Sequence, residues 1–211
     1  MDASIGTEEE DLAPCPPTTY GTPGGAVRTP PPEAGVFSKI SPQKLAIPPK
    51  NYPMPNFTLT SHDLRGQITQ AQVYNGFGAG GDNRSPHLAW TDAPAATESF
   101  LVTCHDTDAP GPGGWWHWVA FNLPATVEQL PTNASADGLP GGAVQLINSY
   151  GERGYGGACP PPGDPAHPYV FTVYALKSRL DLDESASPAM TLFMAASEIL
   201  AKTSLVAYYA R

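Results

Sequence analysis

Four short apolar stretches stand out along the chain, and each is bounded by Gly, Pro, Asn or Asp. They are rich in β-branched and aromatic side chains, which favour the pleated and half-buried surface of a strand. The stretches are Phe57–Thr60, Phe100–His105, Trp116–Leu123 and Tyr169–Leu176. Short strands separated by turn residues are typical of a β-sandwich, so the pattern predicts a mostly β fold.

One clear helical pattern lies near the end of the sequence. Ser187 is a favourable N-cap residue, and Pro188 suits the first helical position. The residues that follow at helical spacing are Met190, Phe193, Met194, Ser197, Ile199 and Leu200. Most of them are apolar, so the pattern predicts one C-terminal helix through these positions. The segment 205–209 fits either a last short strand or the end of a helix.

The first 55 residues differ in character from the rest. They hold twelve of the 25 prolines, carry an acidic run at Glu8–Asp11 and lack apolar periodicity. Such a segment has too little apolar surface to offset the entropy lost on folding, so we expect a disordered, Pro-rich tail over residues 1–55. The remaining residues, 56–211, have the usual size of one domain.

Composition narrows the classes of function and location. A formal net charge of -9, with only 11 Lys and Arg, argues against a nucleic-acid surface, because affinity for a phosphate backbone comes from clustered cations. A recessed phosphate site is still compatible with this charge, since such a site responds mainly to its own donors. No apolar run predicts a transmembrane helix or a secretory signal. The three widely spaced cysteines, Cys15, Cys104 and Cys159, suit a reducing compartment, and we expect the cytoplasm.

Two separate segments carry most of the polar chemistry. One, 106–118, contains the acids of Asp-Thr-Asp-Ala-Pro and the histidine of Trp-Trp-His-Trp. The other, 154–169, contains a loop of glycines and prolines followed by His-Pro-Tyr. The first supplies carboxylates, the second supplies backbone N–H groups and a phenol, and each has an imidazole. We therefore expect one small anion pocket built across both segments.

Alternation of side chains along strands makes part of this expectation geometric. His167 and Tyr169 are two residues apart and therefore point to the same side of a strand. Asp106 shares a face with Val102 and Cys104 at the end of another strand. Both polar groups then stand at strand ends, where a sandwich presents its loops for binding.

Several of these residues also have a plainer interpretation. Asp106 and Asp108 are, on the loop composition alone, more often turn formers that accept backbone hydrogen bonds. His117 between two tryptophans is more often a core histidine, although a second histidine in the other segment favours a ligand role. Tyr155 fits a pocket wall and ordinary packing equally well. Cys159 has no base beside it in the sequence, so we expect no reactive role for it.

The two segments resemble the signature regions of the phosphatidylethanolamine-binding protein family, also called the Raf kinase inhibitor protein-like family. The similar stretches are Asp106–Pro110, Trp116–Trp118, Gly157–Pro161 and His167–Tyr169. The stretch Asn75–Trp90 resembles the bacterial and archaeal branch in particular. The similarity begins at about residue 57 and continues to the last residue, and the tail before it has no counterpart in the family.

The resemblance implies a mostly antiparallel β-sandwich with a small anion pocket near the surface, in which family members accept phosphate or phosphorylated head groups. By position, the residues expected to bind the ligand are Asp106, His117, Gly157, Pro160, His167 and Tyr169. Asp108, Pro110 and Pro161 are expected to shape the two loops. Two positions depart from the family pattern: Thr107 replaces a usual Pro, and Pro168 replaces a common Arg, which removes a cation and a backbone donor.

A carboxylate beside a bound anion needs a physical reason. Asp106 can orient a histidine and favour its protonated form, or it can itself be held protonated by the ligand's charge. It can also meet an ammonium group such as that of ethanolamine. The sequence leaves all three explanations open.

Three classes of function follow from these residues and from the resemblance. The favoured one is a non-catalytic binding protein for a small anionic or phosphorylated ligand of the phospholipid head-group type, without a cofactor. The alternative is an inhibitor or scaffold that acts on a protein kinase or protease through the surface around the pocket. A metal-dependent hydrolase is less favoured. Two histidines and an aspartate can form a metal triad, but the chain lacks Gly-x-Ser-x-Gly, His-Glu-x-x-His and Walker motifs, so we assign no catalytic residue and no metal.

Overall fold

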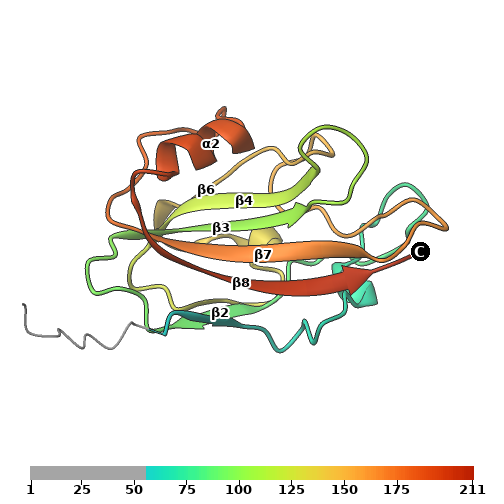
Figure 1. Cartoon of the computed structure of the whole chain (residues 1–211), viewed down its shortest axis with the longest axis horizontal. Helices are drawn as coiled ribbons and strands as arrows, with labels where there is room; N and C mark the ends of the chain where they lie inside the picture. Colours follow the sequence, from blue (N-terminus) through green and yellow to red (C-terminus); the bar gives the residue numbers. More distant parts are fainter. Residues whose placement is uncertain (1–55) are drawn as a thin grey trace, which may run out of the picture. The chain divides into compact units, whose positions relative to one another are not determined.

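The computed structural model describes residues 56–211, and the tail predicted over residues 1–55 lies outside the described residues. Its strands are β1 (Thr58–Thr60), β2 (Leu88–Thr91), β3 (Ser99–Asp106), β4 (Trp115–Pro124), β5 (Gln129–Leu130), β6 (Val144–Gln145), β7 (His167–Leu176) and β8 (Ile199–Tyr209). They form a three-stranded sheet of order β1-β2-β5 and a five-stranded sheet of order β6-β4-β3-β7-β8, with antiparallel pairing throughout. The two sheets form a sandwich (Figure 1), as the sequence predicts.

Side chains from both sheets fill the space between them. Leu88 and Trp90 of the three-stranded sheet are buried in one cluster with Phe100, Trp118 and Phe171 of the five-stranded sheet. Burial of each large apolar side chain stabilises the fold by about 1.5–3 kcal/mol. The inter-sheet core therefore fixes the face of the five-stranded sheet from which the polar residues at its edge project.

The other face of the five-stranded sheet has a smaller core of its own. Leu101, Val119 and Phe121 belong to it because successive side chains of a strand point to opposite faces. Leu192 and Ala195 of helix α2 (Pro188–Ala195) pack against these residues. Helix α2 thus lies on the outer face of the five-stranded sheet, as Figure 1 shows.

Helix α2 begins where the sequence predicts and ends earlier. Ser187 is its N-cap, and the Ser187 hydroxyl accepts a hydrogen bond from the N–H of Met190 at 3.2 Å. The helix ends at Ala195, so the prediction that it continues to Leu200 is wrong. Strand β8 pairs with β7 along its length, and this pairing outweighs the helical spacing of the apolar residues. The segment 205–209 is the last part of this longer strand.

The apolar residues that predict the helix do not form its buried face. Met190, Phe193 and Met194 are 50%, 76% and 44% exposed. The fully buried residues of the helix are Thr191 and Ala195, whose small side chains let it lie close to the sheet. The helical spacing therefore predicts the element correctly but assigns the wrong face to the core.

Three short elements complete the described part of the chain. They are helix α1 (Ala134–Asp137) and the 3₁₀ helices η1 (Gln70–Gln72) and η2 (Pro140–Gly142). Within residues 56–211 no helix has the length and apolar character needed to cross a membrane.

Candidate functional site

Three adjacent strands meet at one edge of the inter-sheet face. Strand β3 ends at Asp106, β4 begins at Trp115, and β7 begins at His167. Because β3 runs antiparallel to both neighbours, its end lies beside their beginnings. Asp106 is paired with Trp115 on one side and with Tyr169 on the other. Strand register thus brings polar residues of both sequence segments to one place.

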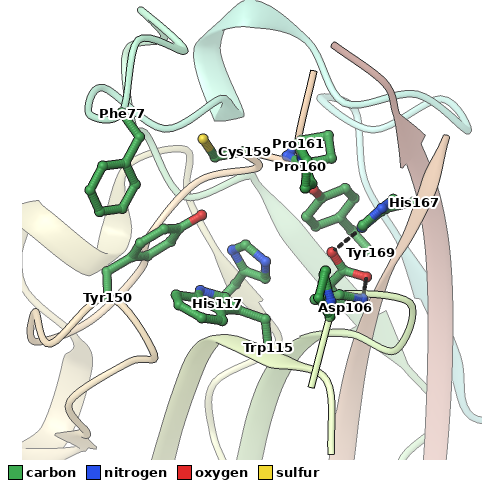
Figure 2. A pocket seen from close by; sticks show the side chains of 12 residues that line it. Phe77, Asp106, Trp115, His117, Tyr150, Cys159, Pro160, Pro161, His167 and Tyr169 are labelled. Atoms are coloured by element: carbon green, nitrogen blue, oxygen red, sulfur yellow. Dashed lines mark hydrogen bonds and ion pairs between the residues drawn. The ribbon is translucent and has the colours of Figure 1, made fainter. Parts of the chain in front are cut away.

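A cavity of about 250 Å³ opens at this edge (Figure 2). Its lining consists of Phe77, Asp106, Ala109, Pro110, Trp115, His117, Tyr150, Cys159, Pro160, Pro161, His167 and Tyr169. The lining includes five of the six residues expected to bind a ligand, and two of the three expected to shape the loops. Gly157 and Asp108 are the two that lie outside it.

Gly157 lies behind the cavity wall and has a packing role. Its N–H donates to Asn83 Oδ1 at 2.7 Å. A Cβ at this position would lie 2.5 Å from the carbonyl oxygen of Gln72 and 2.5 Å from the nitrogen of Tyr74. Glycine is required here because the backbone of the loop passes directly over another backbone segment. Gly157 is therefore not among the residues that line the cavity, and its contact with a ligand stays a prediction.

Both oxygens of the Asp106 carboxylate have partners. Oδ1 accepts from the N–H groups of Asp108 at 3.0 Å and Ala109 at 3.1 Å, which closes the turn after β3. Oδ2 accepts from Nδ1 of His167 at 2.8 Å, and both side chains are buried. On its other side, Nε2 of His167 lies 3.5 Å from Asp164 Oδ2. The carboxylate therefore orients a histidine, which is one of the three explanations left open by the sequence, and it is also a turn former.

His117 connects strand β4 to the second segment. Its Nδ1 donates to the carbonyl of Gly156 at 2.7 Å, and the N–H of Gly156 donates back to the His117 carbonyl at 2.8 Å. A carbonyl can only accept, so Nδ1 carries the proton and Nε2 of the neutral ring is an acceptor. Burial lowers the pKa of His117 to about 4, although the bond to Gly156 and the charge of Asp106 act in the opposite direction. The ring is therefore neutral at pH 7.

Two buried donors of the cavity-lining residues find no hydrogen-bond acceptor within the described residues. They are the hydroxyl of Tyr169 and Nε1–H of Trp115. Burial raises the pKa of Tyr169, and the negative charge of Asp106 acts in the same direction, so the hydroxyl keeps its proton. A buried donor without a partner costs about 1–3 kcal/mol. Both side chains line the cavity, so each donor belongs to its wall and has no acceptor within the described part of the chain.

Comparison with known proteins places the chain in a family. Residues 59–210 match the phosphatidylethanolamine-binding protein family. The chain belongs to this family. The UPF0098 protein YbhB of Escherichia coli is 47% identical over 156 residues, which cover 72% of this chain and 98% of YbhB. An archaeal UPF0098 protein, from Methanothermobacter thermautotrophicus, is 40% identical over 132 residues, which cover 62% of this chain and 85% of that protein. The predicted resemblance to the bacterial and archaeal branch is confirmed.

Solved structures of two relatives have the same fold. The crystal structure of E. coli YbcL, described as a new member of the mammalian phosphatidylethanolamine-binding protein family, superposes with a TM-score of 0.71 at 43% identity and covers 74% of this chain and 98% of its own. A phosphatidylethanolamine-binding protein homologue from Chlamydia trachomatis, CT736, superposes with a TM-score of 0.65 at 29% identity, with coverage of 74% and 99%. The predicted fold class is thereby confirmed.

The two departures from the family pattern lie outside the cavity lining. Pro168 stands in β7 between His167 and Tyr169, so its side chain leaves the strand on the opposite face. The arginine common at this position in phosphatidylethanolamine-binding proteins would start from that same face. The hydroxyl of Thr107 donates to Asp108 Oδ1 at 3.1 Å within the turn. Neither Thr107 nor Pro168 is among the residues that line the cavity.

Tyr150 is a lining residue that the sequence analysis missed. Its hydroxyl donates to the carbonyl of Gly157 at 2.9 Å, and its ring stacks on Tyr74 with centroids 4.0 Å apart. Tyr155, which was considered instead, belongs to the inter-sheet core and donates to the carbonyl of Gln72 at 2.9 Å. No motif around Tyr150 marks it, because its contacts come from residues distant in the sequence.

The remaining wall of the cavity is mostly apolar. Phe77, which is 73% exposed, stands at its mouth with the prolines and alanine of the two loops. None of the twelve lining residues is Lys or Arg. No group of three or more His, Cys, Asp or Glu side chains within residues 56–211 is placed to hold a metal ion, and Nδ1 of both cavity histidines is engaged in a hydrogen bond.

Proposed function

We propose that this protein is a non-catalytic binding protein that holds a small phosphorylated or anionic ligand in the cavity between β3, β4 and β7. The main support is the pair of buried donors without partners in the described part of the chain, the Tyr169 hydroxyl and Trp115 Nε1–H. Phosphate oxygens are suitable acceptors for such donors. A phosphate and a short substituent, as in a phospholipid head group, suit a cavity of about 250 Å³.

The other polar residues of the cavity support binding rather than catalysis. Asp106 uses both oxygens to hold His167 and the turn, and His117 uses Nδ1 to hold the second segment. The hydrogen bonds of the two cavity histidines go to Gly156 and Asp106, so among the described residues the Cys159 thiol is not paired with either base. The groups are arranged as a rigid, preformed site, which lowers the entropy lost when a ligand binds.

Removal of the Tyr169 hydroxyl tests this proposal. The parent protein and Tyr169→Phe are titrated with phosphoethanolamine and with inorganic phosphate by calorimetry. A hydrogen bond to a charged group contributes about 1.5–3 kcal/mol, so we expect the affinity of Tyr169→Phe to be about 10- to 100-fold weaker.

Tyr155→Phe is the matched control. It removes the same atom from a tyrosine of the inter-sheet core that does not line the cavity, so it should bind like the parent. The proposal fails if the parent binds neither ligand, or if Tyr169→Phe binds as tightly as the parent.

A further inference from the structure

The cavity offers hydrogen-bond donors but no fixed positive charge. Its lining contains no Lys or Arg, and its one carboxylate, Asp106, is bonded to His167. Outside the lining, the guanidinium of Arg211 donates to the carbonyl of Phe77 at 2.9 Å. A doubly charged anion would enter a mostly apolar space beside a buried carboxylate, and such a charge is expensive to bury without a partner.

His117 adds an acceptor to this space. Its Nδ1–H is engaged with Gly156, so Nε2 carries a lone pair and no proton. The ring stands edge-to-face with Tyr150 and Tyr169, at centroid distances of 5.6 Å and 5.0 Å, and Figure 2 shows it between them at the cavity. The hydrogen bond with good geometry that the ring makes within residues 56–211 is that of Nδ1, and the backbone of Gly157 also lies close to the ring. A ligand that fits must therefore bring a donor as well as acceptors.

We infer that the cavity binds a phosphomonoester in its singly charged form, with a P–OH group that donates to Nε2 of His117. The other phosphate oxygens accept from the Tyr169 hydroxyl and from Trp115 Nε1–H. The inference rests on the proposed function and adds the protonation state that the site selects. A phosphomonoester loses its second proton near pH 6, so at pH 7 the selected form is roughly a tenth of the ligand.

Several titratable groups lie near His117 or share the cavity with it. Asp106 and His105 of β3 act on its charge, Tyr150 and Tyr169 stand edge-to-face with its ring, and His167 and Cys159 line the same cavity. Burial keeps His117 neutral between pH 6 and 8 and raises the pKa of both tyrosines, which stay protonated. Between pH 6 and 8, the proton that makes binding depend on pH is therefore assigned to the ligand. The rival explanation places this proton on His167.

The first test uses two ligands of the same shape on the unmodified full-length chain. Phosphoethanolamine can carry a P–OH proton, whereas ethanolamine sulfate is a permanent monoanion without one. Calorimetry from pH 5.5 to 8.5 should show the affinity for phosphoethanolamine falling about tenfold per pH unit above pH 6. At pH 6 ethanolamine sulfate should bind at least about tenfold more weakly, because its oxygens face the lone pair of Nε2.

Two asparagine variants separate His117 from His167. His117→Asn retains a donor near Gly156 but lacks Nε2, so phosphate and sulfate esters should bind it with similar affinity. His167→Asn retains a donor to Asp106 and should keep the pH slope of the parent. His62→Asn, at a side chain that is 63% exposed, controls for the loss of an imidazole far from the cavity lining.

The outcomes distinguish this inference from the proposed function. Binding that does not change with pH, or equal affinity for the two esters at pH 6, overturns the inference. The proposed function as an anion-binding protein would still stand. A slope that persists in His117→Asn and vanishes in His167→Asn also overturns it. Absence of phosphoethanolamine binding at every pH overturns the proposed function as well. The ligand comparison on the parent chain decides the question even if a variant fails to fold.

Discussion

His117 links strand β4 to the loop that covers the cavity, and it does so as a neutral ring. Its Nδ1–H is bonded to Gly156, and burial lowers its pKa to about 4. In an unfolded chain a histidine titrates near pH 6.5. Between these two values the unfolded chain binds the additional proton and the folded chain does not. Stability is therefore highest above pH 6.5 and decreases as the pH falls toward 4.

This linkage predicts a measurable pH dependence of stability. We expect His117 to lower the free energy of unfolding by about 2–3 kcal/mol between pH 7.5 and 4.5, at about 1.4 kcal/mol per pKa unit. His117→Asn removes the titrating ring and should lose correspondingly less over the same interval. Urea unfolding at the two pH values measures both, with His62→Asn as the control. Equal pH slopes in the parent and His117→Asn would show that the ring is not buried in its neutral form.

At the scale of elements, the second segment is held in place by backbone packing rather than by its polar side chains. Ala158 forms a parallel bridge with Val73, and Gly157 lies against the backbone on both sides of that bridge. Gly157 has no positive φ, so its role is purely steric. Glycine is needed so that the loop can approach closely enough for Pro160 to reach the cavity.

Replacing this glycine should therefore destabilise the fold through a clash. We expect Gly157→Ala to lower the free energy of unfolding by about 1–3 kcal/mol, the usual cost of overpacking. Gly163→Ala is a useful comparison, because its added Cβ meets open space while its φ of 88° penalises a side chain by about 1–2 kcal/mol. In urea unfolding, a Gly157→Ala protein as stable as the parent would contradict the packing role.

The same elements show how far the sequence could predict the structure. The central strands were predictable because runs such as Phe100–His105 alternate between two apolar faces of one sheet. The end of α2 was not, because Ile199 and Leu200 suit a helix and a strand equally, and only the pairing of β8 with β7 decides between them. The gathering of Asp106, His167 and Tyr169 at strand ends was predictable from side-chain alternation, but the sequence did not indicate which histidine Asp106 contacts. Tyr150 was missed because its partners are distant in sequence.

At the scale of the whole molecule, an acidic chain carries a cavity whose lining has no cationic Lys or Arg side chain. The formal net charge is -9, and no Lys or Arg lines the cavity. Most anion sites have the opposite arrangement, in which local cations attract the ligand and added salt weakens binding. For the proposed anionic ligand, the long-range field of the chain is repulsive, and the expected attraction comes from neutral donors that salt hardly screens.

Salt should therefore strengthen binding. The screening length falls from about 30 Å at 0.01 M to about 8 Å at 0.15 M ionic strength, so repulsion from distant acidic residues is largely removed. We expect the affinity for methyl phosphate at pH 6 to rise about twofold over this interval, measured by calorimetry with a bulky sulfonate salt that does not compete for the cavity. Affinity that falls steeply with salt would mean that a cation reaches the ligand. Arg211, beside Phe77 at the mouth, would then be the first residue to replace, because its guanidinium donates a hydrogen bond to the carbonyl of Phe77.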